Sequence, residues 1–160
     1  MTDPQDSTLL GRVVETYAHE LANSPEGRER LARLGVENAA LLDRFKVGWS
    51  AGTLASMARG EVLERLRALG LVDAGGKERF AGYVVIPAFD ERGEVAQLAA
   101  YAPNDRVAWL VPDETPVFWN AAILKHAREV VIARDPLAAL VEFAKGREAT
   151  IAPAGHGIPL

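Results

Sequence analysis

The spacing of the apolar residues changes near Phe80, and this change constrains the fold more than any other feature of the sequence. Before it, Leu9, Val13, Tyr17 and Leu21 follow one another at intervals of four, as on one face of an amphipathic helix. After it, the stretch YVVIPAFDERGEVAQLAAYA reads as two strands around a polar turn that contains glycine. The sequence therefore predicts a helical first half followed by an antiparallel sheet.

Caps and glycines divide the helical half into four segments. Ser7 is the predicted cap of the first helix, the Asn23–Pro25 stretch separates it from the second, and Gly35 and Gly70 end the second and the fourth. The predicted helices lie within residues 7–23, 25–35, 37–45 and 60–70.

The end of the chain predicts a strand–helix–strand unit. A buried strand over 129–133, a helix over 136–145 and a strand over 149–152 have the order of a parallel crossover. Before this unit, RVAWLVP predicts a third strand of the sheet, and PVFWNAAILKHA predicts a strand that ends in a short helix. The predicted fold class is α+β, with a helical region at 1–77, an antiparallel β-rich region at 78–127 and a partial α/β unit at 128–160.

Composition excludes several kinds of site. The chain has no cysteine, which excludes disulfides, cysteine-ligated metal and a thiol nucleophile. Its net charge is −4, with ten Lys/Arg against eleven Asp/Glu in residues 1–77 and eight against eleven in 78–160, which argues against strong, undirected nucleic-acid binding. The polar start MTDPQDST and the lack of a long apolar run predict a cytoplasmic protein that does not contact the membrane.

The order of these pieces resembles the bacterial DnaG-type primases, and more closely their shorter relatives on mobile elements. SPEGRERLARLGVENAALLDRFKVGWS, LGLV followed by GGKERFAGYVVIPAFDERGEVAQLAAY, and WLVPDETPVFWN are similar to successive segments of that family. REVVIARDPLAALVEFAKGREATIAPAGHG is similar to the opening strand–helix–strand of the TOPRIM fold. The resemblance covers about residues 7–158, and it implies that the terminal unit is a partial TOPRIM-like unit.

The chain departs from this family at the residues that carry the chemistry. The resemblance implies that the family's metal-binding glutamate and the aspartate that follows it would stand at the positions that Arg134 and Ala138 occupy in this chain. If the register slips by one, those positions are occupied by Ala133 and Leu137. The family's later Asp-x-Asp would lie beyond Leu160, and its zinc-binding module has no counterpart. Two-metal phosphoryl transfer needs several converging carboxylates.

From these departures we expect a protein without catalytic residues, metal or cofactor. The sequence predicts that it is not an enzyme but a degenerate, non-catalytic module in DNA replication or mobile-element biology, which binds a partner protein and, weakly, single-stranded DNA or RNA. The alternative is the N-terminal part of a primase whose catalytic TOPRIM half comes from a downstream segment or from a second chain.

Basic side chains in the second half of the chain are the predicted contacts to nucleic acid. Arg134 stands before a helix start, where backbone N–H groups favour phosphate, and the turn PAGHGIP resembles a loop that borders the active centre in TOPRIM relatives. The predicted nucleic-acid-binding residues are Arg106, Lys125, Arg128, Arg134 and His156.

Two of these interpretations have structural alternatives. Asp135 is either a displaced metal ligand or, as we favour, the cap of the helix that begins at Pro136. The aromatic side chains of the sheet either stack on bases or, as we favour, pack in the core; they are Tyr83, Tyr101, Trp109 and Trp119.

The terminal unit also predicts an open apolar edge, because 130–133 and 149–152 supply only two strands. Such edges are usually paired or covered. We therefore expect either a homodimer or pairing of this unit with the preceding sheet.

Overall fold

The computed structural model describes residues 4–111 and 117–155. Its helices are α1 (Pro4–Ala22), α2 (Pro25–Arg33), α3 (Ala39–Arg44), α4 (Leu54–Met57), α5 (Glu61–Ala68), the 3₁₀ helix η1 (Ala121–Lys125) and α6 (Pro136–Ala144). Its strands are β1 (Gly48–Trp49), β2 (Val84–Phe89), β3 (Val95–Tyr101), β4 (Val107–Trp109), β5 (Val117–Trp119), β6 (Val131–Ile132) and β7 (Thr150–Ala154). This mixture of helices and mainly antiparallel strands confirms the predicted α+β class.

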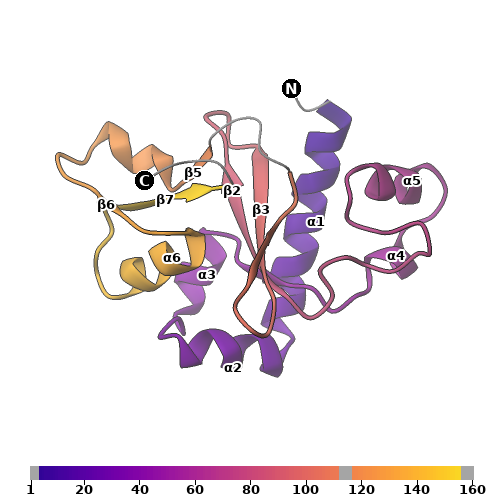
Figure 1. Cartoon of the computed structure of the whole chain (residues 1–160), viewed down its shortest axis with the longest axis horizontal. Coiled ribbons are helices and arrows are strands. Elements are labelled where there is room, and N and C mark those ends of the chain that lie inside the picture. Colours follow the sequence, from indigo (N-terminus) through magenta and orange to yellow (C-terminus); the bar gives the residue numbers. More distant parts are fainter. Residues whose placement is uncertain (1–3, 112–116, 156–160) are drawn as a thin grey trace.

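The larger sheet is built around the β2–β3 hairpin. Its strand order is β1-β2-β3-β4, and every neighbouring pair is antiparallel. The side chain of Asp90 closes the hairpin turn by accepting hydrogen bonds from the N–H groups of Arg92 and Glu94, and Gly93 supplies the positive φ of 79°. Figure 1 shows this turn at the top and the β3–β4 turn at the bottom, beside α2.

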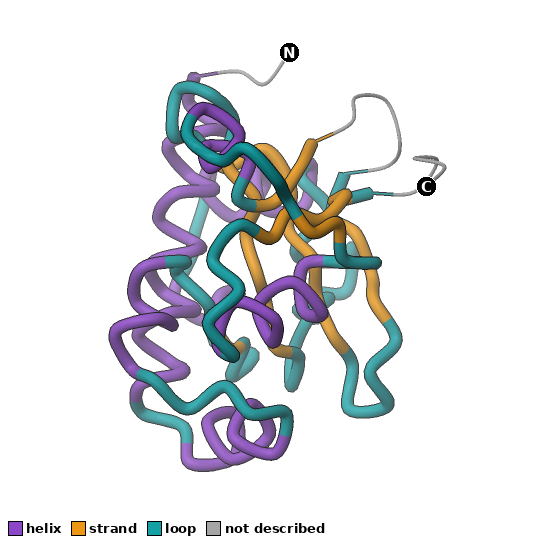
Figure 2. Tube along the Cα trace, turned by 90° about the vertical axis from the view of Figure 1, so that its left-hand side faces the viewer, coloured by secondary structure: helices purple, strands orange, loops and turns teal. Residues whose placement is uncertain are grey.

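Both faces of this sheet are buried. Alternate residues of β2 enter two different clusters: Val84 and Ile86 join one, and Val85 joins the other. One cluster packs the sheet against α1 and α5, and the other packs it against α2, α3, α6 and the smaller sheet. Figure 2 shows α1 running alongside the strands. Burial on both faces explains why VVIPAF and VAQLAAY are nearly continuous apolar stretches.

The smaller sheet has the order β5-β7-β6. β6 and β7 are parallel and are joined through α6, which confirms the predicted crossover. β5 is antiparallel to β7, so the terminal unit pairs with a strand from region 78–127, although not with the larger sheet. β7 is fully buried. The division into three regions and the homodimer stay predictions.

The prediction of a buried strand over 129–133 was wrong. β6 has two residues, and the side chains of Val131 and Ile132 are 44% and 54% exposed. The apolar pattern is present, but β6 lies at the edge of its sheet, and burial of an edge strand depends on what covers it.

The one capping prediction for the helical half was wrong. Ser24 and Asn38, which the sequence analysis did not name as caps, accept hydrogen bonds from the N–H groups at the starts of α2 and α3. Ser7, the predicted cap of the first helix, is buried inside α1, which begins at Pro4. No helix in the described part of the chain is long and apolar enough to cross a membrane.

Two glycines provide a test of these packing contacts. A Cβ at Gly11, inside α1, would meet no atom within 4 Å. We expect Gly11→Ala to raise the free energy of unfolding by about 0.5–1 kcal/mol, because alanine loses less backbone entropy in a helix. A Cβ at Gly48 would lie 2.5 Å from Tyr17 Cβ, and we expect Gly48→Ala to lower the free energy by about 1–3 kcal/mol. Urea unfolding measures both, and a destabilised Gly11→Ala variant would contradict the packing of α1.

Candidate nucleic-acid interface and the turn at Arg134

The turn between β6 and α6 is fixed by a helix cap. Asp135 Oδ1 accepts a hydrogen bond from the Ala138 N–H at 2.9 Å, and Pro136 occupies the first position of α6. A proline at this position has no N–H to leave unpaired. The favoured interpretation of Asp135 as a cap is confirmed.

The hydroxyl group of Tyr101 joins this turn to the larger sheet. It donates to Asp135 Oδ1 at 3.1 Å and accepts from the Leu137 N–H at 2.9 Å. Burial, followed by the nearby Asp135 carboxylate, raises the pKa of Tyr101, which keeps the hydroxyl protonated and able to donate. The end of β3 is thereby tied to the start of α6.

These contacts occupy the donors that a phosphate would use at the start of α6. The N–H groups of Leu137 and Ala138 both bind oxygen atoms of the chain itself. The Arg134 side chain is 85% exposed and pairs with Asp135 Oδ2 at 3.2 Å. The Arg134 side chain is therefore accessible to a ligand. The N–H groups of Leu137 and Ala138 at the start of α6 are already hydrogen-bonded within the chain.

The other predicted basic residues do not lie together. Lys125 ends η1 and Arg128 follows it, and both are exposed. Arg106 is exposed in the β3–β4 turn, which Arg30 fixes to α2 through hydrogen bonds to the backbone oxygens of Tyr101 and Ala102. Figure 1 places this turn at the bottom and η1 (orange) at the upper left.

The predicted site residue His156 lies outside the described residues. In the part of the chain that the structure describes, no three His, Asp or Glu side chains converge as metal ligands would. The roles of the five predicted nucleic-acid-binding residues stay predictions.

The aromatic candidates for base stacking are mostly core residues. Tyr101, Trp109 and Trp119 are at most 8% exposed, which confirms core packing for these three. The Trp119 ring lies 4.5 Å from that of Phe45, centroid to centroid. Tyr83 is half-buried and packs beside Phe80.

A buried carboxylate that the sequence did not predict holds the helical half together. Glu78 is 4% exposed, and its Oε1 accepts hydrogen bonds from the hydroxyl groups of Tyr17 and Ser50. Its Oε2 accepts from the Leu54 N–H at 3.0 Å. Burial, followed by the charge of Glu78, raises the pKa of Tyr17. A glutamate in a loop is ordinarily exposed, so no local signal identified it.

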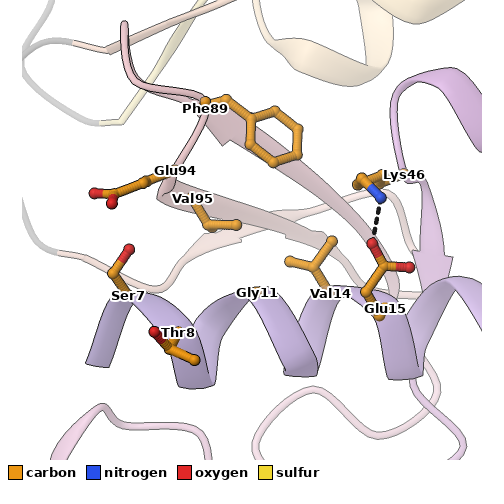
Figure 3. Close-up of a pocket in the computed structure, with 10 residues that line it drawn as sticks. Ser7, Thr8, Gly11, Val14, Glu15, Lys46, Phe89, Glu94 and Val95 are labelled. Carbon is orange, nitrogen blue, oxygen red and sulfur yellow. Dashed lines mark hydrogen bonds and ion pairs between the residues drawn. The ribbon is translucent and has the colours of Figure 1, made fainter. Parts of the chain in front are cut away.

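A groove of about 290 Å³ separates α1 from the β2–β3 hairpin (Figure 3). The residues that line it are Ser7, Thr8, Gly11, Val14, Glu15, Lys46, Phe89, Gly93, Glu94 and Val95. Lys46, the one basic side chain among these lining residues, is paired with Glu15 at one end of the groove (Figure 3). None of the predicted site residues lines it, and its one cation is already neutralised.

The fold is similar to solved catalytic domains of DnaG primases. It superposes on a DnaG primase catalytic domain bound to single-stranded DNA with a TM-score of 0.79 and 16% identity, over 95% of this chain and 54% of that one. For the Mycobacterium tuberculosis primase RNA polymerase domain, in complex with double-stranded DNA carrying an overhang, the TM-score is 0.75 and the identity 18%, over 99% and 57%. For the Aquifex aeolicus zinc-binding and RNA polymerase domains the values are 0.76 and 18%, over 93% and 41%.

The chain thus spans about half the length of the solved structures it matches. No family model matches it, and no curated protein matches its sequence. At these identities the likeness establishes a primase-like fold. The prediction that the chain is not an enzyme was wrong, because the structures that share its fold are catalytic domains.

The link between Tyr101 and Asp135 has a measurable effect on stability. We expect Tyr101→Phe to lower the free energy of unfolding by about 1–3 kcal/mol, because it leaves the buried Leu137 N–H without an acceptor and removes one of the two donors to Asp135 Oδ1. Tyr83→Phe is the matched control, since within the described residues the Tyr83 hydroxyl makes no hydrogen bond. Equal urea midpoints for the two variants would contradict this link.

The raised pKa values of Tyr17 and Tyr101 predict loss of stability in alkali. Above about pH 10 the unfolded chain loses phenolic protons that the folded chain keeps, so the folded state binds more protons and the free energy of unfolding falls as pH rises. The slope is up to about 1.4 kcal/mol per pH unit for each tyrosine. We expect Tyr101→Phe to reduce the slope in urea unfolding between pH 9 and pH 11, on the order of that amount. An unchanged slope would show that Tyr101 ionises normally in the folded protein.

Proposed function

We propose that this chain forms the nucleic-acid-guiding part of a primase-type catalytic core, and that the metal-binding carboxylates come from a polypeptide segment outside the described residues. The observation that carries this proposal is the superposition on primase catalytic domains over nearly the whole of this chain and about half of theirs. Under this proposal the protein works in DNA replication, in the cytoplasm. A narrower kinship with mobile-element primases is part of the same hypothesis.

The chemistry of the described residues supports a role in binding nucleic acid, with the metal-binding carboxylates supplied by another segment. Phosphoryl transfer with two metal ions requires several carboxylates around the metals, and the turn at Arg134 offers a capping aspartate beside an arginine. An exposed guanidinium group is suited to hold a phosphate. The described part therefore fits the binding of a strand better than the coordination of metal.

The distribution of charge supports weak binding through a few local contacts. Lys125, Arg128 and Arg134 lie in the segment around β6, within a chain whose net charge is −4. Repulsion between the acidic protein and the phosphate backbone limits the affinity, and release of counterions from each contact makes the binding sensitive to salt. Arg106, at the far end of the larger sheet, is a separate contact under this proposal.

Fluorescence anisotropy with a labelled single-stranded oligonucleotide tests this interface. We expect binding at low salt that weakens with a log–log slope of about −0.7 for each phosphate contact. The double variant Lys125→Glu/Arg128→Glu should reduce the slope by about 1.4 and the affinity by at least about tenfold. Arg106→Glu, measured alone, reports whether the β3–β4 turn contributes.

The matched control reverses two exposed charges elsewhere. Arg59→Glu/Lys77→Glu changes the net charge by the same amount, between α4 and α5 and in the loop that follows α5. If both double variants lose the same affinity, the effect is one of total charge and the interface is wrong. No detectable binding of the oligonucleotide at low salt would contradict the strand-guiding role itself.

A further inference from the structure

A glycine in the middle of α1 is not required by the packing of the chain. Gly11 lies inside the helix, where glycine is less favourable than alanine. A Cβ at this position would meet no atom within 4 Å, so no neighbouring group demands the absence of a side chain. The open space at Gly11 belongs to the groove between α1 and the β2–β3 hairpin (Figure 3). Glycine is a residue that lets a ligand come close to the backbone.

Apolar side chains surround this open position. Phe89, Val14 and Val95 line the middle of the groove (Figure 3). Val14 and Val95 are at most 5% exposed, whereas Phe89 is only partly buried. An apolar ligand in the groove would remove the remaining surface of the Phe89 ring from water, which favours binding. The volume of about 290 Å³ lies at the lower end of the range for ligand pockets, so it holds one or two side chains rather than a helix.

The two ends of the groove differ in charge. At one end, Lys46 and Glu15 form an ion pair and neutralise each other. At the other end, near Ser7, stands Glu94 (Figure 3). Glu94 is exposed, and within the residues that the structure describes no ion pair reaches its carboxylate. The groove therefore combines an apolar middle with one unpaired negative charge.

These properties fit a segment of a protein better than a free small molecule. A ligand held by one small groove and one exposed ion pair binds with a dissociation constant on the order of 1 mM. In a protein–protein interface, by contrast, an apolar side chain that fills a pocket contributes much of the binding energy of a larger contact. A second copy of this chain, with its net charge of −4, complements the acidic end of the groove less well than a basic segment does.

We infer that the groove binds a partner protein through an aromatic or branched apolar residue that is followed by arginine or lysine. The apolar side chain would lie over Gly11 against the ring of Phe89, and the cation would face Glu94. None of the residues proposed to contact nucleic acid lines this groove. The inference therefore goes beyond the proposed function and does not depend on it.

Titration with two capped dipeptides, followed by nuclear magnetic resonance, tests this site. Acetyl-phenylalanyl-arginine amide carries the proposed apolar group and cation, and acetyl-phenylalanyl-glutamate amide is its charge-reversed match. We expect the arginine peptide to shift the amide signals of Gly11 and Val95 with a dissociation constant on the order of 1 mM. The glutamate peptide should bind at least about threefold more weakly, because an exposed ion pair changes affinity by up to about fivefold.

Substitutions then separate the charge from the apolar contact. Glu94→Gln should weaken the arginine peptide about two- to threefold and reduce the difference between the two peptides. Glu91→Gln is the matched control, because Glu91 is an exposed acid of the same turn that does not line the groove. Gly11→Leu places a side chain in the open position and should weaken both peptides at least about fivefold. Gly11→Ala should weaken them by a smaller factor in a protein that urea unfolding shows to be fully folded.

Four results would overturn the inference. Equal affinity for the two peptides would remove the role of Glu94, and the absence of shifts at Gly11 and Val95 would place any binding elsewhere. Unchanged peptide binding by folded Gly11→Leu would show that the open position is not part of the site. A dimer in sedimentation that Gly11→Leu dissociates would assign the groove to a second copy of the chain. Oligonucleotide binding is measured on residues outside the groove, so this inference and the proposed function can fail independently.

Discussion

Burial of both faces of the β2–β3 hairpin is the constraint on which the rest of the fold depends. A two-faced sheet is stable only if separate elements cover each face. Here α1 and α5 pack on one side, and α2, α3, α6 and the smaller sheet pack on the other. The helical half and the terminal α/β unit are therefore the two layers that one central sheet requires, although nothing in their local sequence relates them to each other.

Tyr101 turns this packing into a defined geometry at the start of α6. Apolar contacts alone would allow the terminal unit to slide on the sheet, because they have little directionality. The Tyr101 hydroxyl adds two directional bonds, to the Asp135 carboxylate and from the Leu137 N–H. The turn that carries Arg134 is thus held by the end of β3, and the arginine can stay exposed without loosening α6, which begins directly after the turn.

Features that depend on a few neighbouring residues were predictable from the sequence, and features that depend on distant neighbours were not. The hairpin turn at Asp90, the Asp135 cap and the crossover through α6 follow from local chemistry and chain connectivity. The exposure of β6 depends on which strand lies next to it. The burial of Glu78 depends on donors that lie up to 61 residues away in the chain.

The distance between Arg106 and the pair Lys125 and Arg128 also depends on parts of the fold that are far apart in the sequence. Their spacing in sequence suggested one surface, but β4 and β5 carry the chain from the β3–β4 turn, beside α2, to the opposite end of the sheet before η1 begins. Lys125 and Arg128 stay near each other only because they are close in the chain, at the end of η1 and just before β6. Whether basic side chains share one surface therefore depends on the path of the strands between them, and the local sequence does not specify that path.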